Sequence, residues 1–167
     1  MLETFNGLPL QQAEAELLAC CAAPAWAREV AAGRPYRAVA ELLDTGEAAF
    51  AKLTWAELAE ALAAHPRIGQ RSPGPSESRP SESREAEWSR REQSGVDGAQ
   101  EALAEVNRAY EDRFGRVFLI FATGKSAEDV LAAARERLGN DEATERGIVR
   151  EELRKIVLLR LENVARE

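Results

Sequence analysis

The chain has 167 residues, of which 45% are hydrophobic and 31% are charged, a composition typical of a soluble globular domain. The formal net charge of −7 and an isoelectric point near 5.0 argue against nucleic acid or an anionic membrane as the main partner. The longest apolar runs are too short to span a bilayer, and the first residues lack the features of a signal peptide. We therefore expect one domain over residues 1–167, in which a local cation can still bind a small anion.

The two cysteines, Cys20 and Cys21, are adjacent and cannot form an ordinary structural disulfide with each other. The only histidine, His65, is the only other soft ligand, so no set of metal-binding residues is visible. The cysteines are expected to be a small apolar pair in a buried helix. This cysteine usage fits a reducing cytoplasm and a protein without a metal ion.

Helical periodicity predicts the secondary structure of the first 64 residues. Thr54, followed three residues later by Glu57, has the pattern of a capping box that starts a helix. Pro66 disfavours a helical conformation at the residue before it, so His65 is expected at the C-terminus of that helix. The expected helices span residues 10–22, 24–32, 37–43, 47–53 and 54–64.

A polar segment without apolar residues follows, "SPGPSESRPSESR", in which the pentapeptide "PSESR" occurs twice. Such a composition cannot bury a hydrophobic face, so we expect a mobile surface loop at about residues 70–84. Two interpretations stay open: a tolerated insertion, which the composition favours, and a lid over a nearby site.

The helical pattern resumes after the loop, and Gly115 and Ser126 are expected to end one helix and begin the next. Between them, the run "VFLIF" has no helical length and no second strand to pair with, so we expect a buried extended segment. The fold class predicted is all-α, a single-domain helical bundle of about seven to nine helices. The later helices are expected at residues 85–93, 97–114 and 126–138, and from residue 140 or 141 to near the end.

Five residues could form a site for proton transfer. Ser89, Glu92 and Gln93 are spaced to share one helix face, and Arg160 interrupts an apolar face where an unpaired charge would be costly. His65 would titrate near neutrality, Glu92 could orient it or relay a proton, and Gln93 would bind amide-like groups. Arg160 could bind a carboxylate. Spacing alone also allows solvated helix faces and a histidine that merely ends a helix.

The chain resembles the 2-oxo-4-hydroxy-4-carboxy-5-ureidoimidazoline (OHCU) decarboxylase family over most of its length. Because four motifs occur in the family's order, the match is more specific than any one of them would be. The form "HPRIG" is similar to that of the bacterial branch, and the loop before "WSRREQSGV" looks longer than in other members. The motifs are "AHPRIG", "WSRREQSGV", "NRAYEDRFGRVFLIFATGKS" and "REELRKIVLLRLE".

The resemblance implies a role for particular residues of this chain. His65 and Glu92 would be catalytic, since they match the histidine of the "HP" motif and the glutamate of the "EQ" pair. The residues implied to bind the substrate come from the same motifs and from the "FGxxFxI" segment, whose backbone and apolar side chains line the substrate ring. These are Pro66, Ser89, Gln93, Phe118, Ile120, Ala122 and Arg160.

The resemblance also implies an activity: conversion of OHCU to (S)-allantoin and carbon dioxide in urate breakdown, without a metal ion or organic cofactor. The expected partner is a small ureide, with no nucleic acid and no membrane, and the expected assembly is a homodimer in the cytoplasm. Two other functions remain possible. One is a non-catalytic helical module that binds a small anion or a protein, and the other is a different cofactor-free lyase or hydrolase of ureides.

Overall fold

Helices make up the regular structure of the part of the chain that the computed structural model describes, residues 1–68, 80–92 and 99–167. No strand occurs within these ranges, so the predicted all-α class is confirmed. The helices described are α1 (Leu2–Gly7), α2 (Leu10–Cys20), α3 (Pro24–Ala32), α4 (Val39–Ala51), α5 (Trp55–Ala63), α6 (Pro80–Glu92), α7 (Gln100–Phe114), α8 (Ala127–Arg137) and α9 (Glu142–Arg166).

Local capping interactions start and end several helices where the sequence predicts them. The Thr54 hydroxyl accepts a hydrogen bond from the Glu57 backbone N–H at 3.2 Å and begins α5. Ser126 and Asp129 form a reciprocal capping box at the start of α8. Gly115 ends α7 in the left-handed conformation, with φ of 70°, which a residue with a side chain would adopt only with strain.

The helices differ from the prediction at three places. Residues 37–43 and 47–53 were expected as two short elements, yet α4 is continuous across Gly46, which lies against α9. Helix α1 was not expected. The loop predicted at about residues 70–84 ends earlier, because α6 begins at Pro80 and the second "PSESR" copy is helical. Proline is compatible with the first turn of a helix, where its missing N–H has no intrahelical partner. The first copy lies outside the described residues.

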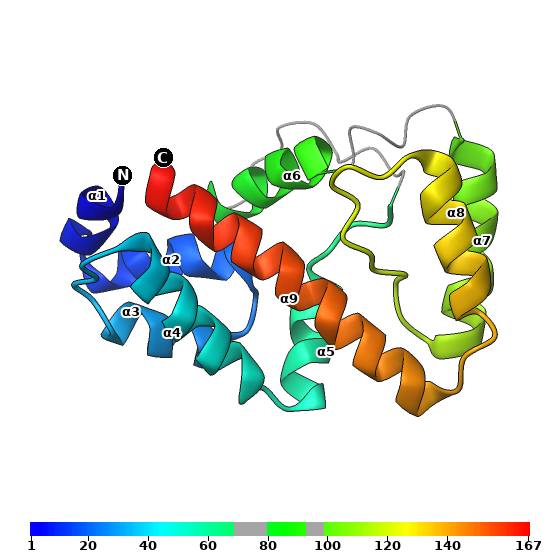
Figure 1. Ribbon diagram of the computed structural model, residues 1–167, viewed down its shortest axis with the longest axis horizontal. Coiled ribbons are helices and arrows are strands. Elements are labelled where there is room, and N and C mark those ends of the chain that lie inside the picture. The colour runs from blue at the N-terminus through cyan, green and yellow to red at the C-terminus, as the bar shows by residue number, and fades with distance from the viewer. Residues whose placement is uncertain (69–79, 93–98) are drawn as a thin grey trace.

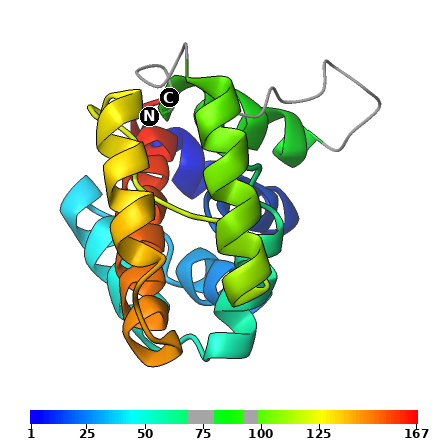
Figure 2. The same cartoon turned by 90° about the vertical axis from the view of Figure 1, so that its right-hand side faces the viewer.

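Helix α9 links two groups of helices that bury separate apolar clusters (Figure 1). One cluster is built mainly by α1–α5 with α9 from Val149 onward, and it includes Trp26, Phe50 and Leu161. The other lies between α7 and α8, which stand side by side in Figure 2, and it includes Tyr110 and Phe118. The segment of residues 118–122 contributes to both clusters, so it runs where the two groups meet.

The close packing of α4 on α9 makes Gly46 sensitive to substitution. A Cβ atom at Gly46 would come within 2.5 Å of Leu161 Cδ2, whereas one at Gly147 on α9 would meet nothing within 4 Å. We expect Gly46→Ala to lower the free energy of unfolding by about 1 kcal/mol, because overpacking outweighs the gain in helix propensity. Gly147→Ala should raise it by up to about 1 kcal/mol. Urea unfolding measures both, and equal shifts of the same sign would contradict the packing argument.

Both cysteines lie in the first cluster, as predicted, although Cys21 follows the last residue of α2. Burial raises the pKa of both thiols, so they remain protonated and poorly nucleophilic at neutral pH. Within the described ranges, no helix combines the length and the apolar character that a membrane span requires.

Candidate active site

A small cavity with a free volume of about 20 Å³ lies where the end of α5, α6, α9 and the 118–122 segment converge. Eight of the nine predicted site residues line it, although they come from four separate stretches of the chain. The ninth, Gln93, lies outside the described residues. The lining residues are His65, Pro66, Ile68, Ser89, Glu92, Phe118, Leu119, Ile120, Ala122, Ile156 and Arg160.

Arg160 is the charged centre of the cavity, and its side chain is only 1% exposed. Its Nε donates to Oε1 of Glu92 at 2.9 Å, and its Nη2 donates to Oε2 at 3.2 Å. Nη2 also donates to the Ser89 hydroxyl at 3.1 Å. This paired geometry is the strong form of an arginine–carboxylate contact, and it satisfies the charge that α9 carries into the core.

The remaining nitrogen of Arg160 is less firmly held. Nη1 lies 3.4 Å from the Ala19 carbonyl and 3.5 Å from Oε1 of Glu85. Although burial opposes ionisation, the hydrogen bonds and charge of Glu92, with the charge of Glu85, hold the pKa of Arg160 above its usual value. Arg160 is therefore a cation at every physiological pH, and Nη1 is the donor that can be redirected at the lowest cost.

Helix α6 presents the acceptors for Arg160 on one face. Ser89 and Glu92 are three residues apart, as the sequence predicts, and Glu85 lies four residues before Ser89 on the same side. The side chain of Glu92 is 11% exposed, so it is nearly desolvated and directed at α9 rather than at solvent. The spacing therefore marks the face of α6 that lines the cavity.

His65 follows the end of α5, and its backbone N–H donates to the Leu62 carbonyl at 3.0 Å. The residue is 8% exposed and lines the cavity together with Arg160. Burial and then the positive charge of Arg160 lower the pKa of His65 from 6.5 to about 3. The prediction that this histidine titrates near neutrality is therefore wrong for the free protein: the imidazole is neutral at neutral pH.

The extended segment of residues 118–122 forms one wall of the cavity. Phe118, Ile120 and Ala122 line it, as predicted, and Leu119 does so as well. Side chains from two helices hold the chain here, and no partner strand occurs among the described residues. The Leu119 carbonyl accepts from Nη1 of Arg137 at 2.7 Å, and the Phe121 N–H donates to Oε2 of Glu152 at 3.0 Å.

The sequence did not single out four residues of this region. Ile156 lies four residues before Arg160 on α9, and Glu85 lies four residues before Ser89 on α6, so helical periodicity could have found both. Ile68 has no such signal, because it lies in irregular chain after Pro66. Leu119 was missed because the residues of this segment were taken from the family pattern "FGxxFxI", which falls on Phe118, Ile120 and Ala122, although the cavity also contacts the residue between Phe118 and Ile120.

The lowered pKa of His65 predicts how stability changes with pH. The unfolded chain binds a proton at this residue below pH 6.5, whereas the folded chain does so only near pH 3. Stability is therefore lost as the pH falls from 6.5 toward 3, by about 2 kcal/mol between pH 7 and pH 5 from this group. His65→Asn should remove that part of the loss. Urea unfolding at the two pH values measures it, and equal losses in both proteins would contradict the expectation.

The fold is thus all-α, and its cavity brings together an imidazole, a hydroxyl, a carboxylate and a guanidinium. A family profile described as OHCU decarboxylase matches residues 6–162. Because this match covers nearly the whole chain, the protein belongs to the OHCU decarboxylase family.

Curated relatives carry related names. The Arabidopsis thaliana uric acid degradation bifunctional protein TTL is 28% identical over 155 residues, which are 92% of this chain and 48% of the relative. The chain therefore spans about half of the length of that protein. The 2-oxo-4-hydroxy-4-carboxy-5-ureidoimidazoline decarboxylase of Haloferax volcanii is 28% identical over 138 residues, 81% of this chain and 79% of the relative. The Amia calva protein of that name is 42% identical over 59 residues, 35% of this chain and 34% of the relative.

Solved structures agree in fold. A crystal structure of OHCU decarboxylase in the presence of (S)-allantoin superposes with a TM-score of 0.75 at 25% identity, covering 92% of this chain and 99% of that chain. A crystal structure of (S)-allantoin synthase superposes with a TM-score of 0.66 at 20% identity, covering 96% of this chain and 52% of that chain. The second likeness concerns the fold alone.

Proposed function

We propose that the chain decarboxylates OHCU to (S)-allantoin and carbon dioxide in uric acid degradation. The observation that carries the proposal is the gathering of His65, Ser89, Glu92 and Arg160 around one cavity, in a chain that belongs to the OHCU decarboxylase family. A binding module for a small anion would need Arg160. It would not need a neutral imidazole at His65 in the same cavity as a Glu92 carboxylate that Arg160 holds in place.

The proposed reaction needs no cofactor from the protein. When the bond between the ring carbon and the carboxylate breaks, its electron pair moves toward the adjacent ring carbon, whose imine nitrogen accepts the displaced charge. The neighbouring hydroxyl loses its proton and becomes the carbonyl of the product. A proton is then added to one face of the adjacent carbon, and the negatively charged ring nitrogen takes up a second proton from solvent, so the carboxylate form of the substrate consumes one proton overall. The protein must therefore orient the substrate, accept one proton and deliver another.

His65 is proposed to accept the hydroxyl proton. A neutral imidazole has a free nitrogen lone pair, which the lowered pKa preserves at working pH. That same low pKa makes it a weak base in the empty cavity. Binding of an anionic substrate brings negative charge next to the ring and replaces water, and negative charge raises the proton affinity of a histidine. The substrate would thus activate the base that acts on it.

Glu92 and Ser89 are proposed to orient the ureido group and the ring. Each oxygen of Glu92 accepts one hydrogen bond from Arg160, so each keeps lone-pair capacity for an N–H of the substrate. The Ser89 hydroxyl accepts from Arg160 and remains free to donate its own proton. Gln93, which the family resemblance adds to this group, would bind the same ureido group.

The contacts of Arg160 change the role proposed for it. A direct clamp on the substrate carboxylate would have to displace existing partners, because Nε and Nη2 are engaged by Glu92 and Ser89. We propose that Arg160 holds those two side chains and stabilises the anionic substrate by its charge, and that only Nη1 turns toward it. A fixed cation stabilises an anion more strongly in a cavity that excludes water than it does in solvent.

The wall formed by Phe118, Ile120 and Ala122 would lie against the ring and, with Pro66, keep water from the reacting carbons. Delivery of the proton from the polar side alone would make the product a single enantiomer. We further propose that the protein acts in the cytoplasm as a single-domain homodimer, an inference that rests on the family resemblance and on the adjacent thiols.

The rate of substrate decay tests the activity. Because OHCU decays spontaneously, it should be made in situ from urate with urate oxidase and hydroxyisourate hydrolase, and its ultraviolet absorbance followed. Decay should accelerate in proportion to the concentration of this protein. A decay rate that is independent of the protein, with correctly folded material, would refute the proposal and leave the binding module as the alternative.

A further inference from the structure

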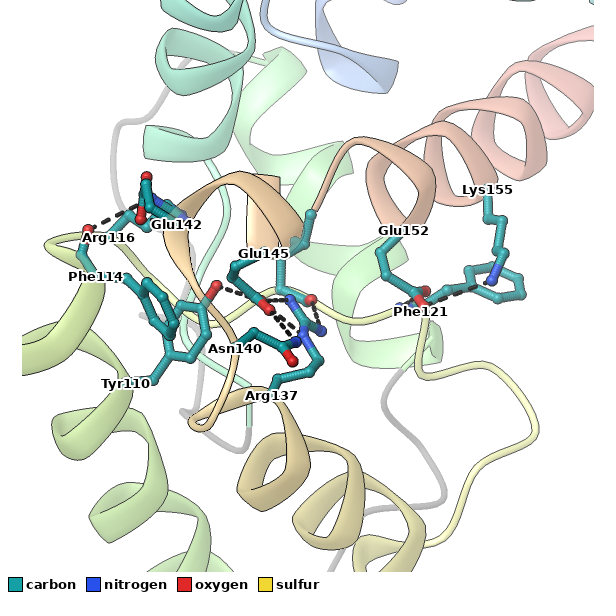
Figure 3. A network of polar contacts seen from close by, with 11 residues as sticks. Tyr110, Phe114, Arg116, Phe121, Arg137, Asn140, Glu142, Glu145, Glu152 and Lys155 are labelled. Carbon is teal, nitrogen blue, oxygen red and sulfur yellow. Dashed lines mark hydrogen bonds and ion pairs between the residues drawn. The ribbon is translucent and has the colours of Figure 1, made fainter. Parts of the chain in front are cut away.

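Outside the cavity, a second buried polar network joins three helices (Figure 3). Glu145, on the first turns of α9, is fully buried, and its two oxygens face side chains from α7, from α8 and from the chain before α9. Tyr110 donates its hydroxyl hydrogen to Oε1 at 2.7 Å, Arg137 donates Nε–H to the same oxygen at 2.7 Å, and Asn140 donates to Oε2 at 3.1 Å.

Arg137 extends this network to the wall of the cavity. Its Nη1 donates to the Leu119 carbonyl at 2.7 Å, and its guanidinium carbon lies 4.6 Å from the centroid of the Phe118 ring. Both Phe118 and Leu119 line the cavity, whereas Arg137 and Glu145 do not. The guanidinium therefore contacts the wall on the side that faces away from the cavity, and Glu145 fixes the orientation of the guanidinium.

Stability alone does not account for an ion pair at this position. Arg137 is 5% exposed and Glu145 is fully buried, so both groups have given up their hydration. Replacing such a pair by apolar residues of similar volume is often neutral or stabilising. What apolar residues cannot do is donate a hydrogen bond in a fixed direction to a backbone carbonyl. The 118–122 segment has no neighbouring strand within the described residues, so its register depends on such side-chain contacts.

We propose that Arg137 is a positioning residue for the reaction. Its hydrogen bond to the Leu119 carbonyl sets the position of the wall formed by Phe118 and Leu119, while Glu145 holds the guanidinium of Arg137. The inference rests on the proposed function, because it assigns this wall to the substrate ring. Burial, and then the hydrogen bond to Glu145, raise the pKa of Tyr110 to about 12, so its hydroxyl stays a donor throughout the working range. The network therefore keeps one arrangement at neutral pH.

Two variants separate positioning from general stability. Arg137→Lys keeps the charge beside Glu145, but an ammonium group lacks the planar fork needed to hold both Glu145 and the Leu119 carbonyl. Tyr110→Phe is the matched control, because it removes one hydrogen bond to Glu145 and leaves the contact between Arg137 and Leu119 in place. Its ring keeps its packing against Phe114 and Phe118, whose centroids lie 4.7 and 5.2 Å away.

We expect kcat/KM of Arg137→Lys to fall about 10- to 100-fold, mostly in kcat, because substrate still enters but is held away from the reactive geometry. Tyr110→Phe should stay within about threefold of the unaltered protein, although it too is less stable. Cooling should not restore the activity of Arg137→Lys, whereas it would if the loss came from unfolding. The backbone ¹⁵N shift of Ile120, which shares the peptide of the Leu119 carbonyl, should change in Arg137→Lys and not in Tyr110→Phe.

If Arg137→Lys does not fold, the double variant Arg137→Gln with Glu145→Gln removes both charges together and should show the same loss. Activity equal to that of Tyr110→Phe in either folded variant would overturn the inference. If the unaltered protein does not decarboxylate OHCU, the proposed function fails instead. The Ile120 shift would then still report whether Arg137 positions the wall.

Discussion

His65→Asn should lower kcat by at least about 100-fold, toward the rate of spontaneous decay, while the protein remains folded. Removal of a positioned acid–base group usually costs a factor of about 10² to 10⁴. The asparagine keeps a small neutral polar side chain at the edge of the cavity, so the free energy of unfolding at pH 7 should change by no more than about 1 kcal/mol. The decay of OHCU absorbance and urea unfolding measure the two quantities on one preparation.

The matched control for this variant is Arg67→Gln. Arg67 is two residues further along the chain, forms an exposed ion pair with Glu111, and does not line the cavity. Loss of this ion pair should leave turnover unchanged, because exposed ion pairs contribute little to the stability of the fold. A His65→Asn protein that keeps full activity and loses several kcal/mol of stability would make the histidine a structural residue.

Arg160→Met should destabilise the protein by about 3–5 kcal/mol and abolish turnover. The substitution leaves the Glu92 and Glu85 side chains, 11% and 12% exposed, without the cation between them. Breaking a buried pair by removing one partner costs more than the pair itself contributes, because the remaining charge is uncompensated. Urea unfolding at pH 7 measures the loss.

Arg154→Met provides the comparison on the same helix. Arg154 forms ion pairs with Glu47 and Glu151, but these lie at the surface and its side chain is 33% exposed. We expect a loss of less than about 1 kcal/mol and normal turnover. Similar losses of stability in both arginine variants would mean that the Arg160 cluster is no more than a surface network.

The sequence predicted best those features that depend on neighbouring residues. The cap at Thr54 and the left-handed end at Gly115 follow from local chemistry, so their positions could be stated in advance. The prediction that Ser89 and Glu92 share one helix face follows from helical spacing for the same reason. Where tertiary packing decided the outcome, local rules failed. Residues 37–43 and 47–53 were expected as separate elements, although Gly46 between them lies inside α4 where Leu161 approaches.

Long-range partners could not be predicted from residue patterns. Arg160 was singled out as a charge on an apolar face, but nothing in the pattern named Glu92, which lies 68 positions earlier, as its partner. Glu145 is an acidic residue in the first turn of a helix, where such residues are common, and its burial depends on α7 and α8 packing over it. The family resemblance supplied the grouping that periodicity could not.

If this cavity decarboxylates OHCU as we propose, it must also deliver a proton to one face of the product. Circular dichroism of the allantoin formed from urate, in the presence of urate oxidase and hydroxyisourate hydrolase, tests the proposal most directly. With this protein present, we expect a strong signal of (S)-allantoin that approaches a single enantiomer as the protein concentration rises. Racemic allantoin, formed at the spontaneous rate by folded protein, would contradict the proposal.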